Sequence, residues 1–555
     1  MPHNTSSDID AIVVGGFSGY SADRSFALES PFYLIRNNVF CDVPGLYKVL
    51  RDPSFNCDPT GFDAPPFVCY ALKQILSDRG FTVEMVFYLD LETNRVTELF
   101  KASCKAVFLS TTLLPNKQML KAATAAVRRF APDAFIVCGG ALVDRSWTIR
   151  KKLLEEKDEL YAPCHSDHLF LGQDADDGCG ADLFIITDPQ LTIASDVLTA
   201  VKKGTSVKAM VSSLPNCAAF NNGTWSFSST FIANEPIVPA IRWSRFRKDE
   251  MRLTVPLIHS RGCPYRCKFC NFQRISGYLE KGQEDFRHEV EDLLQAHGDR
   301  VSTIHFCDDN FCGTRGTLQR FLDAFIDMKS PLEWHSLFDA RFIDGPLAEK
   351  LKVSGCRLLK IGMESADDAI LANIAKPCRV KDYQRAVQAM ADNGISLDAY
   401  FIVGFPGETE GSTQRTVENI NRFPVPTHSV NQLVLFSFLL APLAPVFSRQ
   451  ERDKYGLSGY MHEWRHNTMD STTAQSLIPG MMRQITSMQP PYGNVEKMMV
   501  RNGGVLARID RARGELIRER LVTGKENPVY WETIEGLVGQ LKSKPDPKSG
   551  SVVFE

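Results

Sequence analysis

The sequence lacks a strong charge of either sign. Its 63 Lys and Arg residues and 66 Asp and Glu residues leave a formal net charge of −3 over 555 residues. A nearly neutral chain carries no broad basic field of the kind that attracts nucleic acid or anionic membrane surfaces. We therefore expect neither nucleic acid nor a membrane among its partners.

Long hydrophobic runs are also missing. The longest apolar stretch, residues 433–447, is interrupted by Ser437 and by two prolines, and it is too short to span a bilayer. The first ten residues, MPHNTSSDID, show no signal-peptide pattern. The 15 cysteines are mostly scattered singly, unlike the dense framework of a secreted disulfide protein. These features predict a cytoplasmic protein.

Two common phosphate-binding motifs are absent as well, although the chain alternates between strand and helix patterns. No GxGxxG follows a predicted strand, and no GxxxxGK[ST] occurs. The alternation indicates an α/β fold with parallel sheets. In residues 1–205 it predicts a doubly wound Rossmann-type domain, with its ligand beyond the carboxyl ends of the strands. Strands are predicted at residues 11–16, 81–89, 106–110, 134–140 and 181–187.

A second block, residues 251–440, contains six strand–helix units. Its predicted strands are residues 253–260, 301–309, 332–340, 357–365, 397–406 and 429–439. Six units predict a (β/α)6 partial TIM barrel, whose functional loops follow the strands at the carboxyl face. Residues 206–250 are predicted to be a linker, and residues 441–555 a small mixed region that caps the barrel or contributes to the substrate site.

Three cysteines lie on one short loop after the first strand of the second block. The stretch HSRGCPYRCKFCNF, residues 259–272, contains Cys263, Cys267 and Cys270. A [4Fe-4S] cluster usually takes four thiolates, so a loop with three would leave one iron open to another ligand. A structural zinc site is disfavoured because it needs four protein ligands and no second CxxC pair follows.

The CxxxCxxC pattern on a partial barrel resembles the radical S-adenosylmethionine (SAM) superfamily, in which the open iron is chelated by the amino and carboxylate groups of SAM. The resemblance implies a [4Fe-4S] cluster and a set of SAM contacts. These are Phe269, Gly404 and Phe405 for the adenine, Asp308 or Asp309 for the ammonium group, Arg341 for the carboxylate, and Glu364 with Ser365 for the ribose. The family's Gly-Gly-Glu stretch is missing, and each carboxylate could instead be a helix cap or a surface ion-pair partner.

A Rossmann-type block before such a barrel resembles the cobalamin-binding subgroup of the superfamily. The matching stretches are FLSTTLLP, residues 108–115, and VCGGALV, residues 137–143. The resemblance implies cobalamin contacts from Ser110, Thr111, Thr112, Gly139 and Gly140. The DxHxxG motif of cobalamin mutases is absent, so no histidine is placed to ligate cobalt from below. A nucleotide-binding or purely structural flavodoxin-like sheet is the alternative.

The segment after the barrel contains a W-x-H-x-T-M pattern from Trp464 and His466 to Met469. It resembles cobalamin radical SAM methyltransferases that act on phosphinates. The resemblance implies transfer of a methyl group from methylcobalamin to an unactivated carbon or phosphinate phosphorus of a small molecule, in natural-product biosynthesis. It also implies a one-electron donor such as flavodoxin or ferredoxin. Trp464 and His466 are candidates for the substrate pocket, with packing roles as the alternative.

Three other functions compete with this prediction. A cobalamin radical SAM cyclase or rearrangement enzyme would share the cofactors without transferring methyl. Cys69, Cys104 and Cys138 suggest the second cluster of a methylthiotransferase, but Cys104 and Cys138 are predicted at opposite ends of the sheet. The stretch HEWRH, residues 462–466, matches the HExxH motif of zinc hydrolases, which needs a helix to bring both imidazoles to one face.

Overall fold

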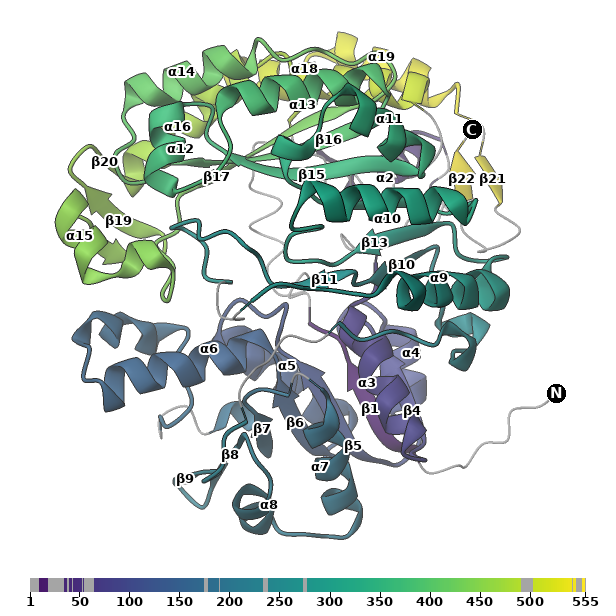
Figure 1. Cartoon of the computed structure of the whole chain (residues 1–555), viewed down its shortest axis with the longest axis vertical. Helices are drawn as coiled ribbons and strands as arrows, with labels where there is room; N and C mark the ends of the chain where they lie inside the picture. The colour runs from purple at the N-terminus through teal and green to yellow at the C-terminus, as the bar shows by residue number, and fades with distance from the viewer. Residues whose placement is uncertain are drawn as a thin grey trace. The chain divides into compact units, whose positions relative to one another are not determined.

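The computed structural model divides into two compact units, which we describe separately (Figure 1). Unit 1 comprises residues 1–24 and 65–245, and unit 2 comprises residues 25–64 and 246–555. The structure describes residues 9–17, 34–36, 39–41, 43–51, 53, 64–173, 178–188, 190–232, 238–272, 277–490, 503–541, 543–545 and 552–554.

Unit 1 contains a seven-stranded sheet in the order β4-β1-β5-β6-β7-β8-β9. Its strands are β1 (Ile9–Val14), β4 (Val83–Val86), β5 (Cys104–Ser110), β6 (Phe135–Gly139), β7 (Leu183–Ile185), β8 (Cys217–Asn221) and β9 (Thr224–Phe227). The first five in this order are parallel neighbours. They follow the flavodoxin-like order 2-1-3-4-5, whose switch point lies between β1 and β5. The predicted doubly wound sheet is confirmed.

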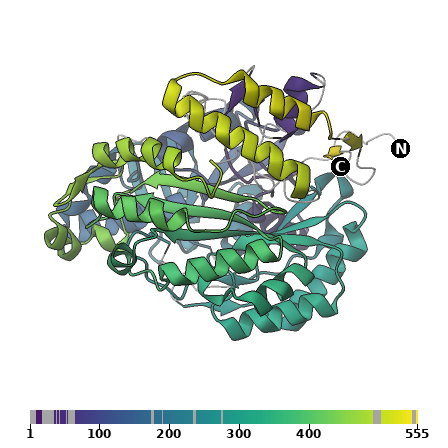
Figure 2. The ribbon, with the colours of Figure 1, turned by 90° about the horizontal axis from the view of Figure 1, so that it is seen from above.

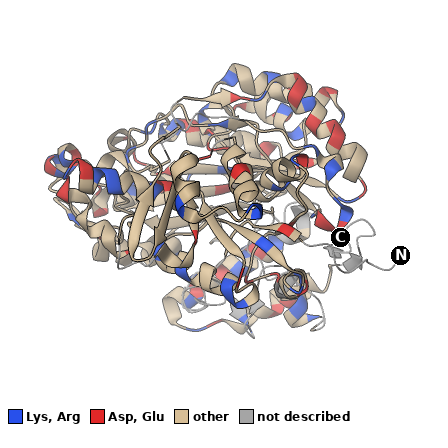
Figure 3. Cartoon of the chain, turned by 90° about the horizontal axis from the view of Figure 1, so that it is seen from below, with Lys and Arg blue, Asp and Glu red and all other residues tan. Residues whose placement is uncertain are grey.

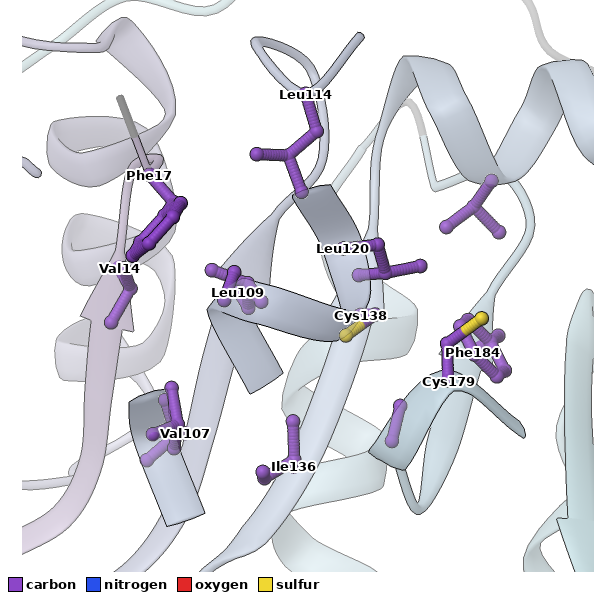
Figure 4. Close-up of a cluster of buried hydrophobic side chains, with 14 of the residues drawn as sticks. Val14, Phe17, Val107, Leu109, Leu114, Leu120, Ile136, Cys138, Cys179 and Phe184 are labelled. Atoms are coloured by element: carbon purple, nitrogen blue, oxygen red, sulfur yellow. The ribbon is translucent and has the colours of Figure 1, made fainter. Parts of the chain in front are cut away.

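Helices pack against this sheet and help to bury its apolar side chains. They are α3 (Phe67–Asp78), α4 (Thr93–Leu99), α5 (Lys117–Phe130), α6 (Ala141–Arg150), α7 (Thr192–Lys202) and α8 (Val207–Ser213). Figure 4 shows side chains of β1, β5 and β6 in one buried cluster that includes Leu120 of α5. Val107, Ile136 and Leu120 are fully buried there. The side chain of Asn116 caps α5 by accepting a hydrogen bond from the Met119 N–H, which fixes where the helix begins.

The predicted linker at residues 206–250 is instead largely part of unit 1. Strands β8 and β9 form a hairpin that extends the sheet antiparallel to β7. Asn222 and Gly223 form its turn with φ of 50° and 77°, and two successive positive φ angles favour a tight hairpin. The domain boundary therefore falls near residue 245 rather than at 205.

Unit 2 contains a six-stranded parallel sheet whose order follows the sequence, as predicted for a (β/α)6 barrel. Its strands are β10 (Thr254–Leu257), β13 (Thr303–Phe306), β14 (Glu333–Leu337), β15 (Cys356–Glu364), β16 (Ser396–Val403) and β17 (Asn431–Ser437). Its helices are α9 (Gln283–His297), α10 (Arg315–Asp327), α11 (Gly345–Val353), α12 (Asp368–Ile374), α13 (Val380–Asp392) and α14 (Glu410–Ile420). Trp334 packs edge-on against Phe306 and Phe321 on the helix-covered face.

The C-terminal helices of unit 2 pack with a segment from near the start of the chain. Figure 2 shows α2 (Val43–Leu50) beside α18 (Gly503–Thr523) and α19 (Pro528–Val538). Leu34, Cys41 and Leu46 share a buried cluster with Trp531 and with Leu358 of β15. Residues 25–64 therefore belong to unit 2, whereas the sequence predicted a continuous domain over residues 1–205. Short apolar patches in an irregular segment carry no periodicity from which this packing could be predicted.

The charged residues agree with the nearly neutral composition. Lys and Arg residues are interspersed with Asp and Glu over the face shown in Figure 3. Within the described ranges, the model contains no helix that is both long and apolar enough to cross a membrane.

Candidate active site

Two aspartates hold the strand that leads into the cysteine loop. The buried Asp308 carboxylate accepts hydrogen bonds from the His259 N–H at 3.2 Å, from the Ser260 hydroxyl at 2.5 Å and from the Ser260 N–H. Asp309 accepts a hydrogen bond from the N–H of Gly262 at 2.9 Å. Burial raises the pKa of Asp308 to about 7, although these hydrogen bonds oppose the shift. Both carboxylates, predicted for the SAM ammonium group, thus have partners at the base of the loop.

The other side of the loop is tied to two further segments of unit 2. The Lys268 N–H donates to the carbonyl oxygen of Ile374 at 2.8 Å, and the Lys268 carbonyl accepts from the N–H of Val446 at 2.9 Å. Its ammonium group pairs with Glu451 at 2.6 Å. A loop fixed at both ends presents its thiols with little conformational freedom, which favours cofactor binding.

The three thiols fit a cluster rather than a single metal ion. Cys263 is exposed, Cys267 is buried and Cys270 is half-buried, and the three interact electrostatically with one another. Over the described residues, no three His, Cys, Asp or Glu side chains converge closely enough to hold one ion. A four-iron cluster has no such requirement because each thiolate binds a different iron. Partial desolvation by the surrounding protein raises the pKa of all three thiols, that of the exposed Cys263 included, and coordination to iron would deprotonate them.

Lys376 is a site residue that the sequence analysis missed. Its positive charge lowers the pKa of Cys263, Cys267 and Cys270, which places it near all three thiols. Its Nζ lies 3.4 Å from Oε1 of Glu364, the residue predicted to contact the SAM ribose. Glu364 has a positive φ of 64° and lies at a register shift between β15 and β16. Lys376 is 106 positions beyond Cys270 in the sequence, so no local pattern indicates their proximity.

Removing the charge of Lys376 is expected to change the cluster rather than the fold. In Lys376→Met we expect the reduction potential of the cluster to fall by about 50–100 mV, because a nearby positive charge favours the reduced, more negative cluster. Spectroelectrochemistry on the purified protein would measure the shift. Lys376→Arg keeps the charge and serves as the control. An unchanged potential in Lys376→Met, and in the double variant with Glu364→Gln, would show that the ammonium group does not act on the cluster.

Arg341 forms a bidentate pair with a neighbour on its own loop. Its Nε lies 3.2 Å from Oδ1 of Asp339, and its Nη2 lies 2.7 Å from Oδ2. Nη2 also donates to the hydroxyl of Tyr265, which lies between two of the cluster cysteines. Asp339 and Tyr265 were not predicted as site residues. They connect the loop after β14 to the cysteine loop and fix the orientation of the Arg341 guanidinium.

The remaining residues predicted for SAM occupy different environments. Phe269 is half-buried on the cysteine loop. The Ser365 hydroxyl lies 3.3 Å from that of Thr416 and is buried. Phe405 is fully buried and packs edge-on against Phe438. Gly404 has φ of 92°, a conformation that favours glycine.

Trp464 and His466 support the loop that contains Gly404. Their rings are stacked with an interplanar angle of 2°. The Trp464 indole N–H donates to the carbonyl oxygen of Phe438 at 2.7 Å, and Nε2 of His466 lies 3.2 Å from the Gly404 carbonyl oxygen. A Cβ on Gly404 would lie 2.4 Å from the Trp464 ring. Both side chains are buried, which agrees with the packing alternative.

Protonation of Glu408, which is hydrogen-bonded to the loop that contains Gly404, makes the stability of unit 2 depend on pH. Its Oε2 accepts a hydrogen bond from the Gly404 N–H at 2.5 Å, and burial raises its pKa from the usual 4.5 to about 8. Because the folded state holds this proton more tightly than the unfolded state, the stability of unit 2 should decrease as the pH rises from about 4.5 to about 8. We expect Glu408→Gln to raise the urea midpoint at pH 8 and to flatten this dependence. The exposed Glu410→Gln is the control, and a dependence that is identical in both variants would contradict the assignment.

The HExxH interpretation is wrong. Residues Glu463–His466 form strand β19 rather than a helix. His466 is buried whereas His462 is exposed, so the two imidazoles do not share the geometry that a zinc hydrolase needs. The glycines at 456 and 459 have positive φ, and Gly459 approaches the backbone of Glu463 too closely for a side chain, which favours this tight antiparallel turn.

In unit 1, the loops predicted to contact cobalamin follow β5 and β6 and meet at the carboxyl edge of the parallel strands. The Thr111 N–H donates to the carbonyl oxygen of Gly139 at 2.7 Å, and the hydroxyl groups of Ser110 and Thr112 are 3.3 Å apart. Gly140 has φ of 120°, and a Cβ there would lie 2.8 Å from Oγ1 of Thr112. A flat cofactor can approach such a backbone closely, and ligands bind at this edge of open α/β sheets. The five residues therefore fit the predicted role.

The cysteines that suggested a methylthiotransferase do not gather into a site. Cys104 lies at the amino end of β5, where it pairs with Ile9 of β1. Cys138 of β6 pairs with Leu109, near the carboxyl end of β5. Cys69 is buried in α3, with its thiol 3.6 Å from the Val86 carbonyl oxygen. The three therefore fit isolated packing roles.

A comparison of the sequence with protein-family models identifies the domain that contains the cysteine loop. The model of the radical SAM superfamily matches residues 257–420, which include the loop and most of the six-stranded sheet. The chain contains a radical SAM domain. This part of the sequence prediction is confirmed.

Two curated relatives and one solved structure extend the comparison. A bacteriochlorophyllide d C-12(1)-methyltransferase of Chlorobaculum tepidum is 29% identical over 38% of this chain and 47% of its own length. An anaerobic magnesium-protoporphyrin IX monomethyl ester cyclase of Rubrivivax gelatinosus is 27% identical over 32% of each chain. The chain thus spans less than half the length of either relative. The solved structure of the radical SAM methyltransferase TsrM of Kitasatospora setae, with tryptophan and a SAM analogue bound, superposes with a TM-score of 0.54 at 15% sequence identity. The superposition covers 84% of this chain and 98% of that chain, which supports the fold.

Proposed function

We propose that this protein is a cobalamin-dependent radical SAM methyltransferase. In this proposal it moves a methyl group from methylcobalamin to an unactivated carbon, or to a phosphinate phosphorus, of a small molecule. The observation that carries the proposal is the presence, in one chain, of a three-thiol loop in a radical SAM domain and of a 2-1-3-4-5 sheet with two glycines at the carboxyl end of β6. The similarity to a curated methyltransferase supports it.

In this function, Cys263, Cys267 and Cys270 would hold the cluster, and Ser110 to Thr112 with Gly139 and Gly140 would contact cobalamin. When bound, the cofactors would supply radical hydrogen abstraction and the methyl group. The residues of the chain position them: Asp308 and Asp309 fix the start of the cysteine loop, and Lys376 places a positive charge beside the thiols. A one-electron donor such as flavodoxin or ferredoxin would reduce the cluster.

A radical SAM cyclase that transfers no methyl group is the second candidate, favoured by the similarity to the magnesium-protoporphyrin ester cyclase. Anaerobic incubation with cobalamin, a reductant and SAM carrying a deuterated methyl group distinguishes the two. We expect labelled methylcobalamin even without substrate, and a substrate that gains three deuterium atoms. Cleavage of SAM with no label on cobalamin or on any product would favour the cyclase.

A further inference from the structure

One face of the six-stranded sheet carries ionisable and polar side chains where a barrel core would ordinarily be apolar. Residues on paired strands share a face at each register position. His305 pairs with His335 across β13 and β14, and Lys360 pairs with Asp398 across β15 and β16. Trp334 and Phe306 lie on the opposite face, against α10. We call the face with the two histidines, Lys360, Asp398 and Tyr400 the inner face.

Two of these buried side chains have polar atoms without a partner. Neither ring nitrogen of His335 has a hydrogen-bond partner among the described residues, and the same is true of Oδ1 of Asp398. His335 is 4% exposed and Asp398 is 5% exposed. A buried polar atom left unsatisfied costs about 1–3 kcal/mol. Three such atoms lie on β14 and β16, the two strands that flank β15, and therefore indicate a site built for a polar ligand.

The charges and hydrogen-bonding groups of the inner face determine which chemical groups the ligand must carry. The Lys360 charge acts on His305, His335 and Asp398. Burial lowers the pKa of both histidines, that of His305 to about 3, so each is neutral near pH 7 and can donate one N–H. The Tyr400 hydroxyl donates to Oδ2 of Asp398 at 2.5 Å, which leaves Oδ1 to accept from a ligand. The complementary head group is an oxyanion next to an N–H or O–H donor.

The surroundings of the polar residues define the rest of the ligand. Leu358, level with His335 on the inner face, belongs to the apolar cluster of α18 and α19 and so closes the amino end of this face. Toward the carboxyl end, Leu337 and Phe436 are 41% and 52% exposed. Apolar side chains exposed above a polar base favour a ligand with a carbon chain. That chain would extend toward the carboxyl ends of the strands, where the cysteine loop lies.

We propose that the inner face binds the head of a small amino acid or hydroxy acid. An oxyanion, carboxylate or phosphinate, lies between Lys360 and His335, and the adjacent amine or hydroxyl donates to Asp398. This inference rests on the proposed function, because it assigns the class of molecule that receives the methyl group. The carbon chain of the ligand then carries the reacting position, away from the head group.

Calorimetric titration of the cluster-loaded full chain tests the proposal without turnover. The probes are L-norleucine, 2-hydroxyhexanoate, hexanoate, hexylamine and (1-aminopentyl)phosphinic acid. We expect norleucine or 2-hydroxyhexanoate to bind at least about fivefold more tightly than hexanoate or hexylamine, which each lack one half of the head. If norleucine binds more tightly than 2-hydroxyhexanoate, the donor of the ligand is an amine, and if less tightly, a hydroxyl. The affinity of the phosphinic acid relative to norleucine shows whether the site prefers a phosphinate or a carboxylate. Equal binding of all probes, or no binding of any, would overturn the proposal.

Variants locate the binding to these residues. His335→Phe should weaken norleucine about tenfold, and His335→Gln, which keeps a donor and an acceptor, should weaken it less. Asp398→Asn should weaken norleucine more than 2-hydroxyhexanoate, while the exposed Asp299→Asn should change neither. Iron content and labelled methylcobalamin, measured on the same samples, report the proposed function separately. A protein that methylates cobalamin but binds all probes alike in every variant would refute this inference alone.

Discussion

Replacing Cys263, Cys267 or Cys270 by alanine is expected to eliminate SAM cleavage. In the proposed function each thiol supplies one of the three protein ligands of the cluster, so the loss of any one leaves a further iron without a protein ligand. Anaerobically purified variants should lose the iron and the visible absorption of the cluster, and 5′-deoxyadenosine formation should fall to the detection limit.

The matched control is Cys104→Ala, which removes a half-buried thiol from unit 1. It should keep wild-type iron content and SAM cleavage. If any of the three loop variants retained a full cluster and wild-type cleavage, the assignment of that cysteine would be wrong. If Cys104→Ala lost the cluster as well, the loss could not be assigned to the loop.

The second large effect is expected for Asp308→Ala. Its carboxylate accepts hydrogen bonds from two backbone N–H groups and one hydroxyl at the base of the cysteine loop. Without it these buried donors lose their acceptor, and we expect unit 2 to be destabilised by about 3–4 kcal/mol. The urea unfolding midpoint and the iron content after reconstitution should both fall, whereas Asp308→Asn, which retains one acceptor oxygen, should show an intermediate loss.

Asp323→Ala is the control for this substitution. Asp323 forms an exposed ion pair with Lys350, and exposed pairs contribute little to stability, so iron content and midpoint should match the wild type. A stable, cluster-loaded Asp308→Ala protein would show that the loop does not depend on this carboxylate. The Asp308 carboxylate of the wild type would then be available to contact SAM, as the sequence predicted.

Regular patterns made most of the fold predictable. Six apolar strands alternating with amphipathic helices predicted β10 and β13 to β17, because strand pairing in a barrel follows the sequence. The sheet of unit 1 was predictable as doubly wound because its strands also alternate with amphipathic helices, although the 2-1-3-4-5 order itself does not follow the sequence. The packing of Leu34, Cys41 and Leu46 against α18 and α19 was not, since it joins segments more than 450 positions apart through a few apolar side chains. The HEWRH stretch misled because a motif of five letters does not specify helix or strand.

The candidate site was predictable only where function concentrates in a short motif. The cysteine loop is local, and its spacing alone indicates a cluster. Lys376 follows α12 and Asp339 follows β14, so both are far from the loop in the sequence and only the structure brings them there. Conversely, Arg341 and Asp308 look like ligand-binding residues in the sequence, but their hydrogen-bond partners are protein groups. A sequence pattern identifies the chemistry of a side chain more readily than it identifies the partner.

The central claim is that one chain holds both a four-iron cluster and cobalamin. Its most direct test is anaerobic purification with cobalamin supplied, followed by iron, sulfide, cobalt and zinc analysis of a single sample. The account predicts about four irons and one cobalt per chain, with the iron absent from Cys263→Ala and the cobalt retained. Iron without cobalt would contradict the cobalamin function of unit 1, and a protein that holds neither metal would contradict the whole account.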